Sequence, residues 1–360
     1  MTWLSQKTKF LRMLAAETSV VAVSQATGSP PKSSVSWEEI LEGADPFLKA
    51  VSKRLVAQAG EFEPEIFPYA EYALSGNGKQ LRPLLVWLSG SAAGKTNDDH
   101  VTAAVIIEMV HLATLVHDDI IDEAEIRRSR PTLAAHWGNE ISVLLGDCLF
   151  AHALKMAASF PTPEICRAVA SATNTVCSGE ILQTQRRRQF QISREEYFKV
   201  LAMKTAELFA LSCDVGAFLS HAAPPHRAAM RQFGLALGTA YQLYDDCLDV
   251  FGSEAAAGKK PGADLSNGEI TLPILIALER MEAGERAKFE AKIKNWNPND
   301  FAGVIQLLEN YEALPESRRV IHQHLAAARQ TLQILPETEG REGLAGLLNF
   351  LAKQSDALGV

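Results

Sequence analysis

The sequence predicts an all-α protein, a single-domain bundle of roughly a dozen helices around a central cavity. Three observations favour this class. From Trp37 onward apolar residues recur near helical spacing, strand-like alternation is almost absent, and two Asp-rich clusters of identical spacing lie inside apolar stretches. The 360 residues are enough for one large core or for two ordinary domains. We expect one domain, 37–360, preceded by a leader, 1–36.

The leader differs in composition from the rest of the chain. Two lysines and an arginine lie among apolar residues, and a stretch containing Ser, Thr and Pro follows. The uninterrupted apolar core of a secretory signal is absent. Glu17 is the only acid before Glu38, so an organelle transit peptide is an alternative to the mobile leader that we favour.

Apolar periodicity and breakers predict the individual helices. Ser36 and Glu39 form a capping signature before the first helix. The break at 76–78 predicts that the next helix starts at Lys79. Further helices are expected over 101–119, 144–158, 169–182, 197–219, 230–251 and 272–281, with shorter ones over 300–359.

Composition excludes several classes of function. A net charge of -8 argues against nucleic acid as the main partner. No uncharged apolar run reaches the ~18 residues of a membrane span, so no transmembrane segment is expected. The 5 cysteines are scattered, odd in number and without CxxC spacing. They predict reduced thiols and a cytoplasmic location.

The two Asp clusters are Asp118-Asp119-Ile120-Ile121-Asp122 and Asp245-Asp246-Cys247-Leu248-Asp249. On a helix, residues four apart share a face, so the first and last acids of each cluster point to one place. Carboxylates this close raise one another's pKa unless a cation intervenes. Mg²⁺ takes one or two carboxylates plus substrate phosphates, so the clusters predict two helices facing each other across a diphosphate. The alternative is a solvated acidic face, which a second copy of the same spacing disfavours.

Basic residues accompany the acids. Lys79 and Arg82 follow the glycine break and are expected on one helical face, while Arg127 and Arg128 follow the first Asp cluster. Arg pairs bidentately with phosphate oxygens, and Lys serves as a point charge. Together they predict a pocket for two phosphorylated ligands, one held through Mg²⁺ and one held by cations directly. Arg130 is expected to be an ordinary surface charge.

Six segments, in this order, resemble the trans-isoprenyl (polyprenyl) diphosphate synthase family. The resemblance spans about Trp37 to Leu278. The segments are GKQLRP (78–83), HLATLVHDDIIDEAEIRRSRPT (111–132), WGNEISVLLGDCLF (137–150), KTAELF (204–209), YQLYDDCLDVFG (241–252) and GKKPGADLSNGEITLP (258–273).

The resemblance implies the isoprenoid synthase fold and a prenyltransferase that joins an allylic prenyl diphosphate to isopentenyl diphosphate head-to-tail. It also implies a homodimer and about three Mg²⁺ ions. Asp118, Asp122 and Asp245 would ligate Mg²⁺, with Asp119, Asp246 and Asp249 holding ligands or waters in place. Lys79, Arg82, His111 and Arg128 would bind isopentenyl diphosphate, and Arg127 the allylic diphosphate. Lys204 and Lys259 would neutralise the leaving group, and Thr205 and Gln242 would present oxygens to the carbocation.

Some of these residues have structural alternatives. His111 lies two turns before Asp118 on the same helix, but lone histidines are more often structural. Thr205 can equally bond back to a helix carbonyl. One departure is Glu269, where the family commonly has a second Lys. It predicts weaker closure over the diphosphates or a different salt-bridge arrangement, with activity retained.

Product length is expected to depend on the residues beneath the first Asp cluster. Ala113 lies about 7.5 Å deeper along the helix than Asp118, with Thr114 beside it. Neither is bulky, whereas family members that stop at C15 typically have aromatics there, so the resemblance implies an all-trans product of C20 or longer. A peripheral membrane contact for product release is a separate expectation. The competing functions are a class I terpene cyclase or head-to-head synthase, and a non-catalytic subunit of a heteromeric synthase.

Overall fold

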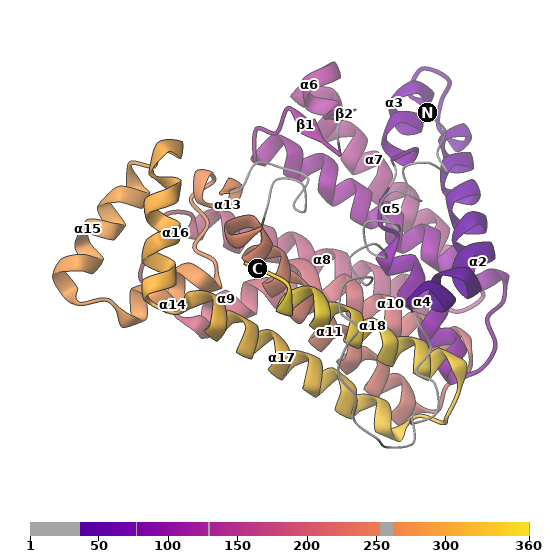
Figure 1. Ribbon diagram of the computed structural model, residues 1–360. Coiled ribbons are helices and arrows are strands. Elements are labelled where there is room, and N and C mark those ends of the chain that lie inside the picture. The colour runs from indigo at the N-terminus through magenta and orange to yellow at the C-terminus, as the bar shows by residue number, and fades with distance from the viewer. Residues whose placement is uncertain (1–36, 77, 129, 253–261, 360) are drawn as a thin grey trace.

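The computed structural model describes residues 37–76, 78–128, 130–252 and 262–359, which are mostly helical (Figure 1). The predicted leader, the capping residue Ser36 and Lys259 lie outside these ranges. The α-helices are α2 (Trp37–Ala57), α3 (Phe67–Leu74), α4 (Leu81–Ala93), α5 (Asp98–Ile121), α6 (Leu133–Trp137), α7 (Asn139–Ala158), α8 (Glu164–Arg186), α9 (Arg194–Leu201), α10 (Glu207–Leu219), α11 (Pro224–Phe251), α13 (Ala263–Ser266), α14 (Leu272–Arg280), α15 (Ala283–Lys294), α16 (Phe301–Asn310), α17 (Ala313–Thr331) and α18 (Glu339–Asp356). Short 3₁₀ turns are η2 (Gln58–Glu61), η4 (Pro298–Asp300) and η5 (Leu332–Ile334), and η3 (Ala202–Ala206) is a π-helix.

The core forms around α10 and α11, which pack on each other and on α4 and α17. Phe209 of α10 and Phe233 of α11 are among the largest fully buried side chains. Burying an aromatic or aliphatic side chain of this size contributes about 1.5–3 kcal/mol. The predicted all-α class is confirmed. Its only described strands are β1 (Ile126–Arg127) and β2 (Arg130–Pro131), an antiparallel pair within the part of the chain that the structure covers.

Helix α5 carries Asp118 and Asp119 on its last turn, and Asp122 follows as its C-cap. It starts at Asp98, three residues before the predicted start, because Asn97 caps it. The Asn97 side chain accepts from the backbone N–H groups of Asp99 and His100, and the His100 ring accepts from the Asn97 N–H in return. This reciprocal cap satisfies donors that the first turn would otherwise leave unpaired. A long helix fixed at its start and buried along its length therefore positions the carboxylates.

The predicted start of a helix at Lys79 is wrong, because α4 begins at Leu81. Gln80 precedes it with φ 52°, a left-handed conformation that cannot continue a helix. Pro83 gives the physical reason. In a helix starting at Lys79, the fifth residue would need an N–H to bond the first carbonyl, and Pro has none. Lys79 thus lies on the connection before α4, and it does not share a helical face with Arg82.

The helix predicted over 197–219 is interrupted by the π-turn η3. Such turns add a residue to the helix and occur often at functional sites. Helix α8 approaches this turn closely at Gly179, where an added Cβ would lie 2.7 Å from the backbone N of Lys204. Only a residue without a side chain allows that approach. The π-turn and Gly179 together set the position of Lys204 and Thr205.

Within the described residues, two helices, α5 and α7, are long and apolar enough to cross a membrane by length and composition. The apolar window of α5 is 72% buried in the bundle, which is typical of a core helix. The corresponding window of α7 is 39% buried, so this helix presents an apolar face at the surface.

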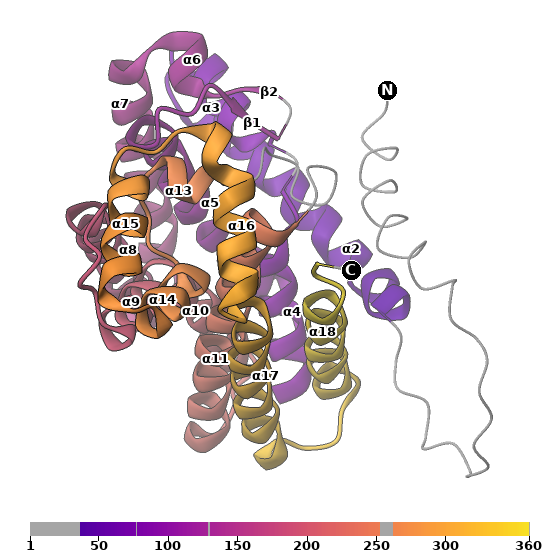
Figure 2. The same cartoon turned by 60° about the vertical axis from the view of Figure 1, so that its left-hand side comes forward.

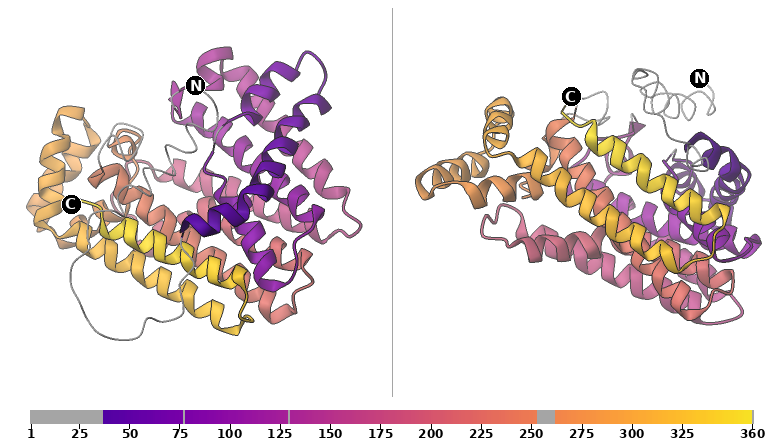
Figure 3. Two further views of the ribbon diagram at one scale, coloured as in Figure 1. Left: turned by 45° about the vertical axis from the view of Figure 1, so that its right-hand side comes forward. Right: turned by 60° about the horizontal axis from the view of Figure 1, so that its bottom comes forward.

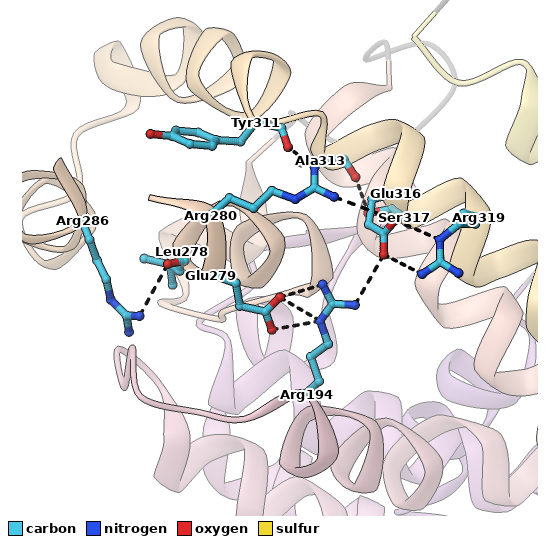
Figure 4. Close-up of polar contacts among 10 residues, drawn as sticks. All are labelled: Arg194, Leu278, Glu279, Arg280, Arg286, Tyr311, Ala313, Glu316, Ser317 and Arg319. Carbon is cyan, nitrogen blue, oxygen red and sulfur yellow. Dashed lines mark hydrogen bonds and ion pairs between the residues drawn. The ribbon is translucent and has the colours of Figure 1, made fainter. Parts of the chain in front are cut away.

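The C-terminal helices lie on one side of the bundle. α15 and α16 project from it (Figure 1) and come forward in Figure 2, and α17 and α18 run antiparallel beside each other (Figure 3). A polar network fixes this region to α9 (Figure 4). Arg194 pairs with Glu279 at 2.7 Å and reaches Glu316 at 3.6 Å, while Arg319 pairs with Glu316 at 2.7 Å. The Arg319 hydrogen bond, with Arg194 and Arg280 nearby, lowers the pKa of Glu316 to about 2.

Candidate active site

One cavity of about 1900 Å³ brings the two Asp clusters together. Its apolar walls come mainly from α2, α4, α5 and α18, and its charged part lies where α5 ends opposite α11. The predicted site residues that line it are Lys79, Asp119, Asp122, Arg127, Arg128, Lys204, Thr205, Gln242 and Asp246. Arg82, His111, Ala113, Thr114, Asp118, Asp245 and Asp249 are described but are not among its lining residues. The predicted central cavity is therefore confirmed.

Cations pair with two of the three acids of the first Asp cluster. Arg127 Nε lies 2.5 Å from Asp119 Oδ1, and Arg187 forms an ion pair with Asp122. The backbone N–H of Asp122 donates to the Asp118 carbonyl at 2.8 Å, so both acids lie on successive turns, as predicted. Burial raises the pKa of Asp118 to about 7, opposed by Lys204 and reinforced by Glu180 and Asp122. Its charged form thus needs more positive charge than the chain alone supplies.

In the second cluster, Asp246 and Asp249 have different partners. Asp246 is buried and accepts hydrogen bonds from Tyr197 Oη and from Gln242 Nε2, the latter at 2.8 Å. Burial raises its pKa to about 7, although both hydrogen bonds lower it. Asp249 accepts from the backbone N–H groups of Ala263 and Asp264 at 3.3 and 3.1 Å. Asp249 therefore anchors α13 beside the cavity.

Thr205 of the π-turn and Gln242 of α11 are polar groups in the cavity wall. Thr205 Oγ1 donates to Gln242 Oε1 at 3.0 Å, and the Gln242 amide nitrogen is held by Asp246. This chain of bonds fixes the Gln242 amide with its oxygen toward Thr205. The hydroxyl of Thr205 bonds Gln242, so its predicted alternative, a bond back to a helix carbonyl, does not occur among the described contacts.

Lys204 lies between acids from two helices. Its Nζ is 2.7 Å from a Glu180 oxygen. Burial lowers the pKa of Lys204, but Asp118, Glu180 and Glu269 raise it more, so the net shift is upward. The ammonium is therefore charged and is held close to the first Asp cluster.

A second basic group surrounds the start of α4. A Cβ at Gly78 would lie 2.9 Å from Arg128 Nη1, so the two predicted basic segments meet. The Arg82 guanidinium stacks 5.2 Å from the Phe209 ring centre, and its buried Nε has no partner among the described residues. Burial, then Arg82 and Arg128, holds the pKa of His111 well below its usual value. His111 is therefore neutral and can donate one hydrogen bond.

In the described part of the chain, no three His, Cys, Asp or Glu side chains are arranged to hold a metal ion. Arginines and backbone groups hold the carboxylates instead. The donor set nevertheless fits a hard divalent cation, because it consists of carboxylates, and burial together with neighbouring acids raises the pKa of Asp118 and of Asp246 to about 7.

The polyprenyl synthetase family model matches residues 63–310 of this chain. The chain belongs to that family. Octaprenyl diphosphate synthase of Escherichia coli (strain K12) is 34% identical over 89% of this chain and 99% of its own length. The short chain isoprenyl diphosphate synthase of Methanothermobacter thermautotrophicus is 30% identical over 88% and 99%. The heptaprenyl diphosphate synthase component 2 of Bacillus subtilis (strain 168) is 34% identical over 79% and 81%.

Solved structures support the same assignment. The polyprenyl synthase from Caulobacter crescentus CB15, complexed with calcium and isoprenyl diphosphate, superposes with a TM-score of 0.82 and 32% identity. The match covers 89% of this chain and 99% of that chain. The predicted family, the isoprenoid synthase fold and the predicted class of enzyme, a prenyltransferase, are thereby confirmed.

For this member of the polyprenyl synthetase family, the structure adds site residues that the sequence did not predict. Tyr197 binds Asp246, Glu180 pairs with Lys204, and Arg187 pairs with Asp122. The run Arg186-Arg187-Arg188 at the end of α8 was an available sequence signal for a cationic site residue, because three consecutive arginines concentrate positive charge. Glu269 lies 3.6 Å from Arg187, an ion pair of the altered kind that its departure from the family pattern predicts.

Proposed function

We propose that this chain is a Mg²⁺-dependent trans-polyprenyl diphosphate synthase. It condenses an allylic prenyl diphosphate with isopentenyl diphosphate head-to-tail. The observation that carries the proposal is a single cavity with carboxylates from both Asp clusters at one end and apolar walls over the rest. A prenyl diphosphate has a charged head group and a hydrocarbon chain, so it needs one polar end and one apolar end in its binding cavity.

Asp118, Asp122 and Asp245 would hold about three Mg²⁺ ions on the allylic diphosphate. When bound, Mg²⁺ supplies Lewis-acid stabilisation of the departing diphosphate. Asp119 and Asp246 orient the ligand carboxylates through their own bonded partners. Arg127 binds the allylic diphosphate, and Lys204 and Lys259 place positive charge where the leaving group's charge develops.

Thr205 and Gln242 would stabilise the allylic cation. Their hydrogen bond, continued to Asp246, fixes both oxygens in advance, so little reorganisation is needed when positive charge appears. Neither group is a strong nucleophile. The apolar walls exclude water, which would otherwise capture the cation.

Isopentenyl diphosphate would bind at the start of α4, through Lys79, Arg82 and Arg128, with neutral His111 as a hydrogen-bond donor. Two observations support this position. The guanidinium of Arg128 lies beside Gly78, and the unpartnered Nε of Arg82 is a buried donor. A buried donor without a partner is costly, and a phosphate oxygen would satisfy it.

We further propose a product of C20 or longer. The cavity volume of about 1900 Å³ and the names of the octaprenyl and heptaprenyl relatives support this length. One relative, 30% identical, is named a short chain isoprenyl diphosphate synthase, so the product length of this chain has to be measured. Ala113 is fully buried, and Leu112, Leu115 and Val116 form the wall of α5. Because neither Ala113 nor Thr114 lines the cavity, a role for them in chain length stays a prediction.

The test is product analysis with the purified chain alone. The protein is incubated with Mg²⁺, isopentenyl diphosphate and farnesyl diphosphate, and products are identified by mass spectrometry. A linear prenyl diphosphate of C20 or longer supports the proposal. A hydrocarbon would instead indicate a terpene cyclase or head-to-head synthase. Absence of any product, with the chain folded, would favour a non-catalytic subunit.

We also propose a homodimer formed through α7 and α8. Leu144 is 61% exposed and Ile181 is 59% exposed, large apolar side chains on two helices that pack side by side. Light scattering after gel filtration should give twice the chain mass, and Leu144→Glu should give the monomer. A monomeric, inactive chain would favour the alternative of a subunit in a heteromeric synthase. The name of the Bacillus subtilis relative, component 2 of a heptaprenyl diphosphate synthase, is consistent with that alternative.

The remaining expectations stay proposals. We propose one domain over 37–360 preceded by a leader over 1–36, and a cytoplasmic location. The 5 cysteines are all free, which is typical of a reducing compartment. Cell fractionation of the full chain, with an antibody against the C-terminal helix, would test the location.

A further inference from the structure

Arg187 has an unusual position for a side chain outside the recognised motifs. It follows the last residue of α8, and its guanidinium lines the cavity. Its side chain is 20% exposed. It joins segments from two distant parts of the chain, since it pairs with Asp122 after α5 and lies 3.6 Å from Glu269 before α14.

The hydrogen bonds of this guanidinium are incomplete. Nη1 donates to the Ile121 carbonyl at 3.2 Å, and Nη2 donates to Asp122. Nε is buried and has no hydrogen-bond partner among the described residues. Leaving a buried charged donor unpaired is costly. A guanidinium that lines a diphosphate cavity with a free donor is suited to an anionic oxygen.

The charges around Arg187 also favour the binding of an anion by this side chain. Four acids gather around this end of the cavity, and the cations that form ion pairs with them are Lys204 and Arg187. A carboxylate at 269, where the family commonly has a Lys, makes the site still more acidic. Arg187, 3.6 Å from Glu269, returns a cation to the same place. The acids are Asp118, Asp122, Glu180 and Glu269.

We propose that Arg187 binds the diphosphate of the allylic substrate, with Glu269 as the carboxylate that orients its guanidinium. The pair carries out, from the end of α8, the role of a lysine at 269. This inference rests on the proposed function, because it assigns a ligand to the same cavity. Asp122 shares the guanidinium, and a cation bound at Asp122 would leave Arg187 to the phosphate oxygens.

The test uses binding without chemistry. Calorimetry with inorganic pyrophosphate and Mg²⁺ compares wild type with Arg187→Gln and with the matched control Arg188→Gln. Arg188 is the exposed next residue and does not line the cavity. Loss of a charge-assisted bidentate contact should weaken pyrophosphate binding about tenfold or more. The control should stay within about twofold of wild type, a difference of less than about 0.5 kcal/mol by the same conversion.

A charge relocation makes the test specific. The double variant Arg187→Gln/Glu269→Lys moves the cation back to the position the family commonly uses, and it should recover pyrophosphate affinity to within about threefold of wild type. In turnover, Arg187→Gln should raise the KM for the allylic diphosphate and leave the KM for isopentenyl diphosphate unchanged. Should Arg187→Gln unfold, Arg187→Lys keeps the charge beside Asp122 while removing Nε, and it should still bind pyrophosphate more weakly.

The outcomes separate this inference from the proposed function. If wild type makes a prenyl diphosphate and Arg187→Gln binds pyrophosphate as tightly as Arg188→Gln, the inference is overturned and the proposed function stands. If wild type makes no such product but pyrophosphate affinity depends on Arg187, the proposed reaction fails and the assignment of Arg187 as an anion-binding residue survives.

Discussion

Substituting Gly179 by alanine tests whether the contact between α8 and the π-turn positions the catalytic groups. The new Cβ would lie 2.7 Å from the backbone N of Lys204 and 2.9 Å from Met203 Cβ. Ordinary contact begins at 3.4 Å, so α8 and η3 must separate by the difference between 3.4 and 2.7, 0.7 Å. Backbone atoms cannot swing away as a flexible side chain does. The strain therefore reaches Lys204 and Thr205 directly.

The expected magnitudes follow from this displacement. Overpacking of this kind costs about 1–3 kcal/mol, which lowers Tm by a few degrees. A misplacement approaching 1 Å at catalytic groups reduces kcat by roughly tenfold to a hundredfold. Differential scanning fluorimetry and a steady-state assay with farnesyl and isopentenyl diphosphates measure both. The KM for isopentenyl diphosphate should change less than kcat, because Lys79, Arg82 and Arg128 lie outside α8 and η3.

Gly284→Ala is the matched control. Gly284 lies in helix α15, and apart from its chain neighbours and the backbone of its own helix no heavy atom of the described residues lies within 4 Å of the position that the new methyl group would take. This substitution should raise stability by about 0.5–1 kcal/mol through helix propensity and leave kcat unchanged. Gly179→Ala with a Tm at or above wild type and kcat within about twofold would refute the reasoning about η3.

Three further predictions concern charge and shape. The raised pKa of Asp118 and Asp246, about 7 against 3.8, means that the native state holds extra protons between about pH 4 and 7. The metal-free protein should lose stability as pH rises through that window, and Mg²⁺ should raise Tm more at pH 8 than at pH 6. Tyr197→Phe removes a donor to the Asp246 carboxylate, so its pKa should rise further and the acidic limb of the kcat/KM profile should move to higher pH. If the acidic limb of the kcat/KM profile does not move, Tyr197 does not control the protonation of Asp246. Ala113→Phe adds a ring at a fully buried position beneath the first Asp cluster, and it should shorten the product; unchanged lengths by chromatography would exclude Ala113 as a determinant.

The sequence predicted the parts of the site that repeat a local spacing. Asp118 and Asp122 lie four residues apart, so helical geometry alone places them together, and the apolar flanks place the cluster inside the bundle. The cavity and the all-α class follow from the same periodicity. The structure confirms the neighbouring positions of Asp118 and Asp122, the cavity and the all-α class.

The features that the sequence does not predict depend on the backbone or on pairing between distant segments. The glycine break predicts a helix from Lys79, but Pro83 limits where α4 can start, and this backbone constraint prevails. The π-turn has no side-chain pattern of its own, so the segment 197–219 looks like one helix. Arg187 and Tyr197 find partners 65 and 49 residues away in sequence, which no local rule could indicate.

The π-turn also has an evolutionary consequence. Each helical residue turns the chain by about 100°, so the extra residue in 202–206 rotates everything after it relative to α9. Losing one residue there would regularise the helix, swing Lys204 or Thr205 out of the cavity and still leave a foldable helical segment. Point substitutions cannot imitate that change. A single-residue deletion in 202–206 would therefore disturb the chemistry of the site while the all-α architecture is kept.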